Sequence, residues 1–328
     1  MSGIVDVGGW VAPGMELIYE RGTTAFRGQW PGIEPMLELA ARRPGRGDWA
    51  HPALELPAVP SRRERHDAWG SDGARAPASS VPAGVLHDNA LGRVAALDEA
   101  GVDLQLISPG PSIDACLQLP STLAAGMFGA YNRYVTAYCR PYPQRLGAVL
   151  QLHGSEPRWS AQEVAELRGE PSVRAASLCL PVRISPEDRH FDPLWEALEN
   201  ADLALLHRPS FGARIWTPGR LVAYLHGGGV FDRYPGLRIG FLAEDSECSA
   251  LELTGAISAQ DPALGSRLFT AASAEQLHRG HDAATPMLWA SDFPLRPSLS
   301  GELASARSAL GAGAQDVLVA APRRFLGM

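Results

Sequence analysis

Short aliphatic runs alternate with helical patterns over most of this chain, and this alternation constrains the fold more strongly than any other feature of the sequence. Runs that are apolar on both faces are typical of parallel strands that helical crossovers bury on both sides. The runs expected as strands span residues 102–108, 146–152, 175–180, 203–207, 237–242 and 286–291, and residues 315–326 are expected to close the chain as a helix. So many strand–helix units in 328 residues favour a closed (β/α)8 barrel over an open doubly wound sheet.

Residues 14–88 interrupt the alternation. They are rich in Pro, Gly and charged residues, and residues 68–82 consist mainly of Gly, Ser, Ala and Pro. Because a first strand is expected over residues 4–7, this segment follows that strand, on the side of the barrel where active sites lie. We therefore predict a distorted (β/α)8 TIM barrel that forms a single domain over residues 1–328, with residues 14–88 as an insertion or lid over the active-site mouth.

The composition excludes several classes of function. All 29 basic residues are arginine, because the sequence contains no lysine. This excludes a lysine Schiff base, covalently held pyridoxal phosphate, a P-loop lysine and a carbamylated-lysine metal bridge. The net charge of −7 argues against a nucleic-acid partner. No apolar run is long enough for a membrane span and no signal peptide is recognisable, so we expect a cytoplasmic protein with reduced cysteines.

Five segments occur in an order that resembles one protein family. They read RVAALDEAGVD at 93–103, YNRY at 131–134, FDPLW at 191–195, GVFDRYPGLRI at 229–239 and WASDFP at 289–294. Together they resemble the amidohydrolase superfamily, in the branch that contains aminocarboxymuconate semialdehyde decarboxylase and the dihydroxybenzoate and resorcylate decarboxylases. Each segment alone is weakly specific, but the five in register cover roughly residues 90–328. The resemblance implies a TIM barrel with hydrolase or lyase activity at the carboxyl ends of its strands.

The metal ligands that the resemblance implies are only partly present. In the family, a His-x-His pair at the end of the first strand grips a divalent ion, but Gly8 and Trp10 occupy these positions here. The fifth-strand histidine corresponds to His207 and the eighth-strand aspartate to Asp292, whereas the sixth-strand histidine is replaced at Ala243. Stable catalytic zinc sites use three protein ligands. We therefore predict no metal site and no resident cofactor, although weak residual metal binding at His207 and Asp292 stays open.

Candidate site residues follow from the expected strand ends. We predict that His207 and Asp292 form the catalytic acid/base pair, although each is also compatible with a purely structural role. The residues predicted to contact substrate are Trp10, His153, Arg183, Glu244 and Asp245. An aromatic ring at position 10 would fill the metal cavity or stack on a flat substrate. An arginine at position 183 would pair with a substrate carboxylate.

Three hypotheses for function stay open. The first is a metal-independent enzyme that acts on a small carboxylated or cyclic substrate by hydrolysis, decarboxylation or related lyase chemistry. The second is a catalytically degenerate subunit that binds a ligand or an active paralogue. The third is an enzyme with a metal site rebuilt from His153, Glu244 or Asp245. The resemblance implies a homodimer, or a dimer with a paralogue under the second hypothesis.

Overall fold

Eight parallel strands form one sheet whose order follows the chain from β1 to β8. The computed structural model describes residues 3–11, 15–30, 89–109, 116, 119–181, 184–207, 216–242, 260–278, 286–294, 296 and 298–328. The strands are β1 (Val5–Val11), β2 (Leu104–Pro109), β3 (Leu146–His153), β4 (Val173–Cys179), β5 (Ala204–His207), β6 (Ile239–Leu242), β7 (Leu268–Ala272) and β8 (Met287–Trp289). Trp10 N–H donates to the Phe293 carbonyl (3.1 Å), which joins the end of β1 to the segment after β8. The sheet therefore closes as a barrel, which confirms the predicted fold class.

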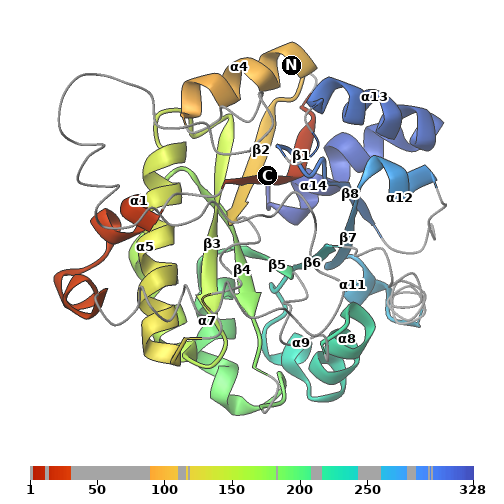
Figure 1. Ribbon diagram of the computed structural model, residues 1–328. Helices are drawn as coiled ribbons and strands as arrows, with labels where there is room; N and C mark the ends of the chain where they lie inside the picture. Colours follow the sequence, from red (N-terminus) through yellow and green to blue (C-terminus); the bar gives the residue numbers. More distant parts are fainter. Residues whose placement is uncertain are drawn as a thin grey trace, which may run out of the picture.

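Helices surround the strands, as Figure 1 shows. They are α1 (Met15–Arg21), α4 (Ala90–Ala100), α5 (Ser121–Cys139), α6 (Pro157–Leu167), α7 (Asp192–Asn200), α8 (Pro218–Gly227), α9 (Val230–Arg233), α11 (Pro262–Gly265), α12 (Ala274–His278), α13 (Leu299–Leu310) and α14 (Ala321–Phe325). Gly101 ends α4 and caps it with a left-handed backbone (φ 72°). The predicted helix at 315–326 is confirmed over residues 315–325, and residues 316–320 within it adopt π-helical hydrogen bonding before α14 begins.

Two apolar clusters show which way the strand residues face. The smaller cluster draws residues from all around the sheet, for example Val7, Val149 and Ala271, and therefore fills the barrel interior. The larger cluster takes the alternate residues, such as Leu150 and Leu205, and packs between the strands and the helices. Strand alternation thus assigns each residue at a carboxyl end either to the barrel mouth or to the helix layer.

The beginning of the predicted insertion is helical. Residues 15–21 form α1 and residues 24–30 form a further helical stretch, and Arg133 of α5 donates to the Arg21 carbonyl (2.6 Å). Residues 31–88, most of the predicted insertion, lie outside the described residues. Among the described helices, none is long and apolar enough to cross a membrane.

Candidate active site at the barrel mouth

The mouth of the barrel differs between its two halves. On β1 to β4, the residues near the carboxyl ends that share the interior side are Trp10, Ser108, Gln151, His153, Ser177 and Cys179. On β5 to β8, the corresponding residues are Leu206, Leu242, Ala271 and Ala290. The described part of the mouth therefore has a polar half and an apolar half.

The end of β1 has no room for the family's first metal ligand. A Cβ atom on Gly8 would lie 2.6 Å from Ala290 Cβ and 2.7 Å from Ala290 Cα, closer than real Cβ contacts come. Trp10 offers no metal-ligating atom. Within the described ranges, no three His, Cys, Asp or Glu side chains group as metal ligands. The described residues thus do not fit the divalent metal that the fold family implies.

Asp6, a residue that the sequence analysis did not single out, organises the polar groups beside this strand end. Its carboxylate is fully buried and accepts hydrogen bonds from Gln105 Nε2 (2.6 Å), Gly8 N (2.9 Å), Ser291 N (2.9 Å) and Ser291 Oγ (2.5 Å). Burial raises the pKa of Asp6, and these hydrogen bonds oppose the shift. Asp6 therefore links β1 to β2 and to the first residues after β8.

Arg93 of α4 extends this network from the helix layer. Its guanidinium donates to Trp10 O (2.9 Å), Gln105 Oε1 (3.0 Å) and Phe293 O (3.4 Å), and it lies 4.9 Å from the centre of the Phe293 ring. Burial lowers the pKa of this arginine, and nearby groups that include Asp6 oppose the shift. Two features of the sequence could have indicated this network. Asp6 lies between two valines in a buried strand, and Arg93 lies on an otherwise apolar turn of α4.

Asp292 lies in the segment that this network holds. Its backbone lies in the left-handed region (φ 59°), which residues other than glycine rarely adopt. Ser291 before it is bonded to Asp6, Phe293 N after it donates to Ser291 Oγ (3.1 Å), and Arg296 N donates to the Asp292 carbonyl (3.2 Å). The half-buried Asp292 is thus held in an uncommon conformation by contacts on both sides.

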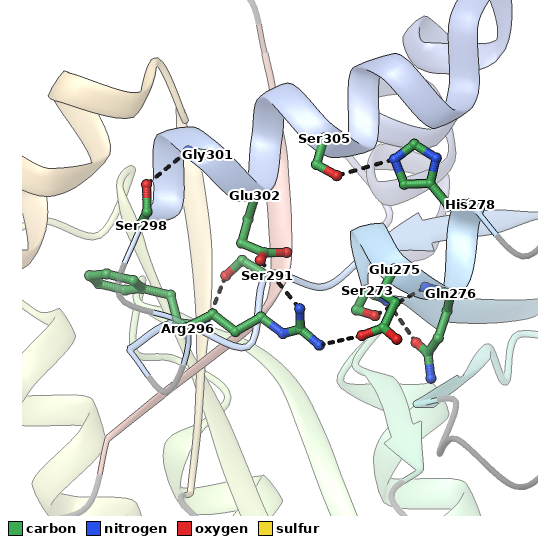
Figure 2. Close-up of polar contacts among 11 residues, drawn as sticks. Ser273, Glu275, Gln276, His278, Ser291, Arg296, Ser298, Gly301, Glu302 and Ser305 are labelled. Carbon is green, nitrogen blue, oxygen red and sulfur yellow. Dashed lines mark hydrogen bonds and ion pairs between the residues drawn. The ribbon is translucent and has the colours of Figure 1, made fainter.

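Arg296 is the cation next to Asp292. Figure 2 shows its guanidinium between Glu275 of α12 and Glu302 of α13, at 3.3 Å and 3.4 Å. Partial burial opposes the charge on Arg296, but the bond to Glu275 and the carboxylates of Glu302 and Asp292 raise its pKa. A positive charge therefore stays beside Asp292 over the whole accessible pH range.

His207, at the end of β5, is enclosed. It shares the side of Leu205, which faces the helices, and its ring lies edge-on to Phe241 with 5.9 Å between the centroids. Nε2 donates to the Trp216 carbonyl (3.0 Å), and Nδ1 has no hydrogen-bond partner among the described residues. Burial lowers the pKa of His207 to about 4, so the ring is neutral near pH 7. Within the described ranges, no contact brings His207 and Asp292 together.

His153, at the end of β3, shares the interior side of its strand. Its Nδ1 accepts a hydrogen bond from Ser155 N (3.2 Å), and its ring centroid lies 5.5 Å from that of Phe128 on α5. Burial lowers the pKa of His153, and Glu156 opposes this shift. The other predicted substrate contacts, Arg183, Glu244 and Asp245, lie outside the described residues, as does Ala243.

Comparison with known proteins supports the fold and leaves the activity open. No family model and no curated protein matches the sequence. Among solved structures, the 5-carboxyvanillate decarboxylase from Novosphingobium aromaticivorans, complexed with manganese and 4-hydroxy-3-methoxy-5-nitrobenzoic acid, aligns with a TM-score of 0.64 and 16% identity over 99% of this chain and 96% of that chain. A 2,6-dihydroxybenzoate decarboxylase from Rhizobium gives 0.55 and 16% over 72% and 87%.

An amidohydrolase from Mycobacterium avium subsp. paratuberculosis also aligns, with a TM-score of 0.59 and 16% identity over 73% of this chain and 74% of that chain. The chain thus has the fold of these amidohydrolases and decarboxylases, which is the fold that the resemblance of its sequence implied.

Proposed function

We propose that this chain is an enzyme that acts on a small carboxylated substrate at the barrel mouth, without the divalent metal ion of the decarboxylases that share its fold. The proposal covers hydrolysis, decarboxylation and related lyase chemistry. It draws on the shared fold, on the motif around Asp292 and on the missing ligands at Gly8 and Trp10.

The observation that carries the proposal is the backbone of Asp292. A non-glycine residue in the left-handed region costs on the order of 1 kcal/mol and persists only where its surroundings fix it, which is common at active sites. The bonds of Ser291, Phe293 and Arg296 supply that fixation here. Asp292 also lies shortly after β8, with Ala290 and Ser291 between them, at the end of the barrel where TIM-barrel chemistry is found.

Proton transfer would then depend on side chains of this chain. A positioned carboxyl group that gives or takes a proton typically contributes about 10²–10⁴-fold to a rate. Asp292 would act as that group, and the apolar side chains of Leu242 and Ala290 would contact the hydrophobic body of the substrate. That His207 is the second member of the pair stays a prediction, because its one described hydrogen bond joins it to Trp216.

Turnover of 5-carboxyvanillate, 2,6-dihydroxybenzoate and a set of lactones, with the protein dialysed against chelator, tests the proposal. We expect turnover of at least one compound that chelation leaves intact. Asp292→Asn keeps the shape of the side chain and its tolerance of left-handed backbone, and we expect it to lower kcat at least about 100-fold in a folded protein. Activity that appears only with a stoichiometric metal, or an Asp292→Asn variant as fast as the parent, would contradict the proposal.

A catalytically degenerate subunit is the second candidate. The enclosed ring of His207 and the packing of Gly8 against Ala290 favour it, because both features occupy positions that bear metal ligands in the family. This candidate predicts ligand binding without turnover and, in its mixed form, a dimer with a metal-bearing paralogue. The turnover assay above distinguishes the two proposals, and light scattering of the pure chain, alone and with such a paralogue, tests the mixed dimer.

A further inference from the structure

We infer that the polar half of the barrel mouth contains a ligand subsite at the ends of β3 and β4, where His153 presents its Nε2–H to a carbonyl or carboxylate oxygen. Cys179 forms the wall of this subsite beside the imidazole. The carboxylated ligand class rests on the proposed function, whereas the subsite itself rests on the geometry of these strand ends.

The strand pairing brings the two side chains to one place. His153 and Cys179 are register partners across β3 and β4, so they point to the same side of the sheet. That side is the barrel interior, because Val149 and Ala175 lie on it in the same two strands and belong to the interior cluster. Both residues occupy the last position of their strand and therefore lie at the rim of the mouth.

The orientation and tautomer of His153 follow from its contacts. Because Nδ1 accepts from Ser155 N–H, the proton of the neutral ring resides on Nε2. Ser160 Oγ accepts from His153 N (2.9 Å) and donates to His153 O (3.0 Å), which fixes the backbone beneath the ring. The ring rests against Phe128. The imidazole is therefore held in place before any ligand arrives.

Nε2 is the ring nitrogen of His153 that has no partner among the described residues. It is not one of the fully buried unpartnered atoms in that part of the chain, so it reaches solvent although His153 is only 6% exposed. A fixed donor that is open to solvent can bind water or a ligand oxygen. A neutral imidazole N–H suits a carbonyl or carboxylate oxygen, and the shift of its pKa keeps the ring neutral around pH 7.

The neighbouring thiol is held as firmly as the imidazole. Gln151 Nε2 donates to Cys179 Sγ (3.2 Å) and to the Leu152 carbonyl (3.0 Å). Asn132 of α5 in turn bonds the backbone N (2.7 Å) and O (3.1 Å) of Gln151. The wall next to the His153 donor is therefore rigid, and a rigid wall favours one orientation of a bound oxygen group.

The two halves of the mouth then orient the ligand. Its oxygen-bearing end binds at β3 and β4, and its apolar body lies toward Leu242, the partly exposed residue of the apolar half. In the eight-strand order, β4 and β8 lie four strands apart and hence across the barrel from each other. Asp292 after β8 therefore meets the ligand at the end away from His153.

Benzoate is a suitable probe, because it carries one carboxylate and one apolar ring. In long-range ¹H–¹⁵N spectra of the imidazoles we expect His153 to be the Nε2–H tautomer, and benzoate to shift that resonance. A protonated Nδ1, or a His153 signal that saturating benzoate leaves unchanged, overturns the inference. These spectra need no turnover, so a protein inactive on every substrate but shifted by benzoate at His153 contradicts the proposed function and supports the subsite.

Calorimetric titration of three variants with benzoate completes the test. His153→Phe keeps a flat ring without the donor, and we expect its benzoate affinity to fall at least about tenfold. His153→Gln restores an N–H donor and should stay within about threefold of the parent. His278→Phe is the matched control, because His278 is exposed on α12 and, among the described residues, bonds only to Ser305 (3.2 Å; Figure 2). We expect no change in its benzoate affinity. Equal affinities for His153→Phe and His278→Phe overturn the inference.

Discussion

The strand ends of β1 and β8 and those of β3 and β4 occupy equivalent places around one barrel, yet they treat their polar groups differently. Beside β1 and β8, the carboxylate of Asp6 accepts four hydrogen bonds from the chain. Arg93 donates to the carbonyl of Trp10 in β1 and to that of Phe293 after β8. At β3 and β4, the ring of His153 is held at Nδ1 but presents Nε2 without a described partner. Internal bonding closes the first region, whereas the second keeps a positioned donor for a ligand. The fold alone therefore does not say where a barrel of this kind binds its ligand.

The largest expected effect concerns the closed region. Asp6→Ala removes the acceptor for Ser291, Gly8 and Gln105, and it leaves these donors buried and Arg93 without its nearest carboxylate. We expect the free energy of unfolding in urea to fall by about 3–5 kcal/mol. Asp6→Asn retains one acceptor and should lose less. If Asp6→Ala lowers the free energy of unfolding by less than about 1 kcal/mol, the network does not hold β1 and β8 together.

His207 extends the comparison to the end of β5, where the ring is enclosed (2% exposed) although only Nε2 has a partner among the described residues. Its pKa is lowered from 6.5 to about 4, so between these pH values the unfolded chain binds a proton that the folded chain does not. Stability therefore falls as the pH drops through this window, by at most about 3 kcal/mol for a shift of this size.

The variant His207→Gln retains a donor for the Trp216 carbonyl but does not titrate. We expect the difference in unfolding free energy between parent and variant to shrink between pH 7 and pH 4. The raised pKa values of Asp6 and Glu163 act in the opposite direction, because their folded forms protonate more easily, and they are common to both proteins. Parallel pH profiles for the two proteins would mean that His207 is accessible and charges normally.

The smallest expected effect concerns a variant that tests whether the end of β1 can bind a metal ion when its ligand types are restored. Gly8→His combined with Trp10→His restores the family's ligand types, but a side chain at position 8 overlaps Ala290. We expect a loss of about 1–3 kcal/mol in stability, as for overpacked cores, and no gain in manganese or zinc by elemental analysis.

The control for this loss is Gly28→Ala, since a Cβ on Gly28 meets nothing within 4 Å. We expect it to be neutral or stabilising by up to about 1 kcal/mol, as for an alanine in a helix. A double variant as stable as the parent and loaded with one metal ion would show that β1 shifts freely and that the region is not closed.

The barrel followed from the sequence because buried strands and crossover helices leave local periodic patterns. The same patterns do not show which way a short strand faces. We predicted His207 as a site residue because it lies at the end of β5. Whether its side chain faces the barrel interior or the helices depends on where the strand begins, and a shift of one residue reverses the two faces. The Asp6 network was out of reach for another reason. Its bonds join residues 99 and 285 positions apart, and only the closed barrel brings them together.

The left-handed backbone at Asp292 also limits which residues can replace it. Asparagine and glycine tolerate such a backbone, whereas longer or β-branched side chains do not. The backbone therefore limits substitutions at this position to a small set of residues, independently of the chemistry. Asp292→Asn removes the charge and keeps the shape, whereas Asp292→Gly removes both and keeps the backbone. Comparing the parent with Asp292→Asn therefore measures the effect of the charge, and comparing the two variants measures the effect of the side-chain shape.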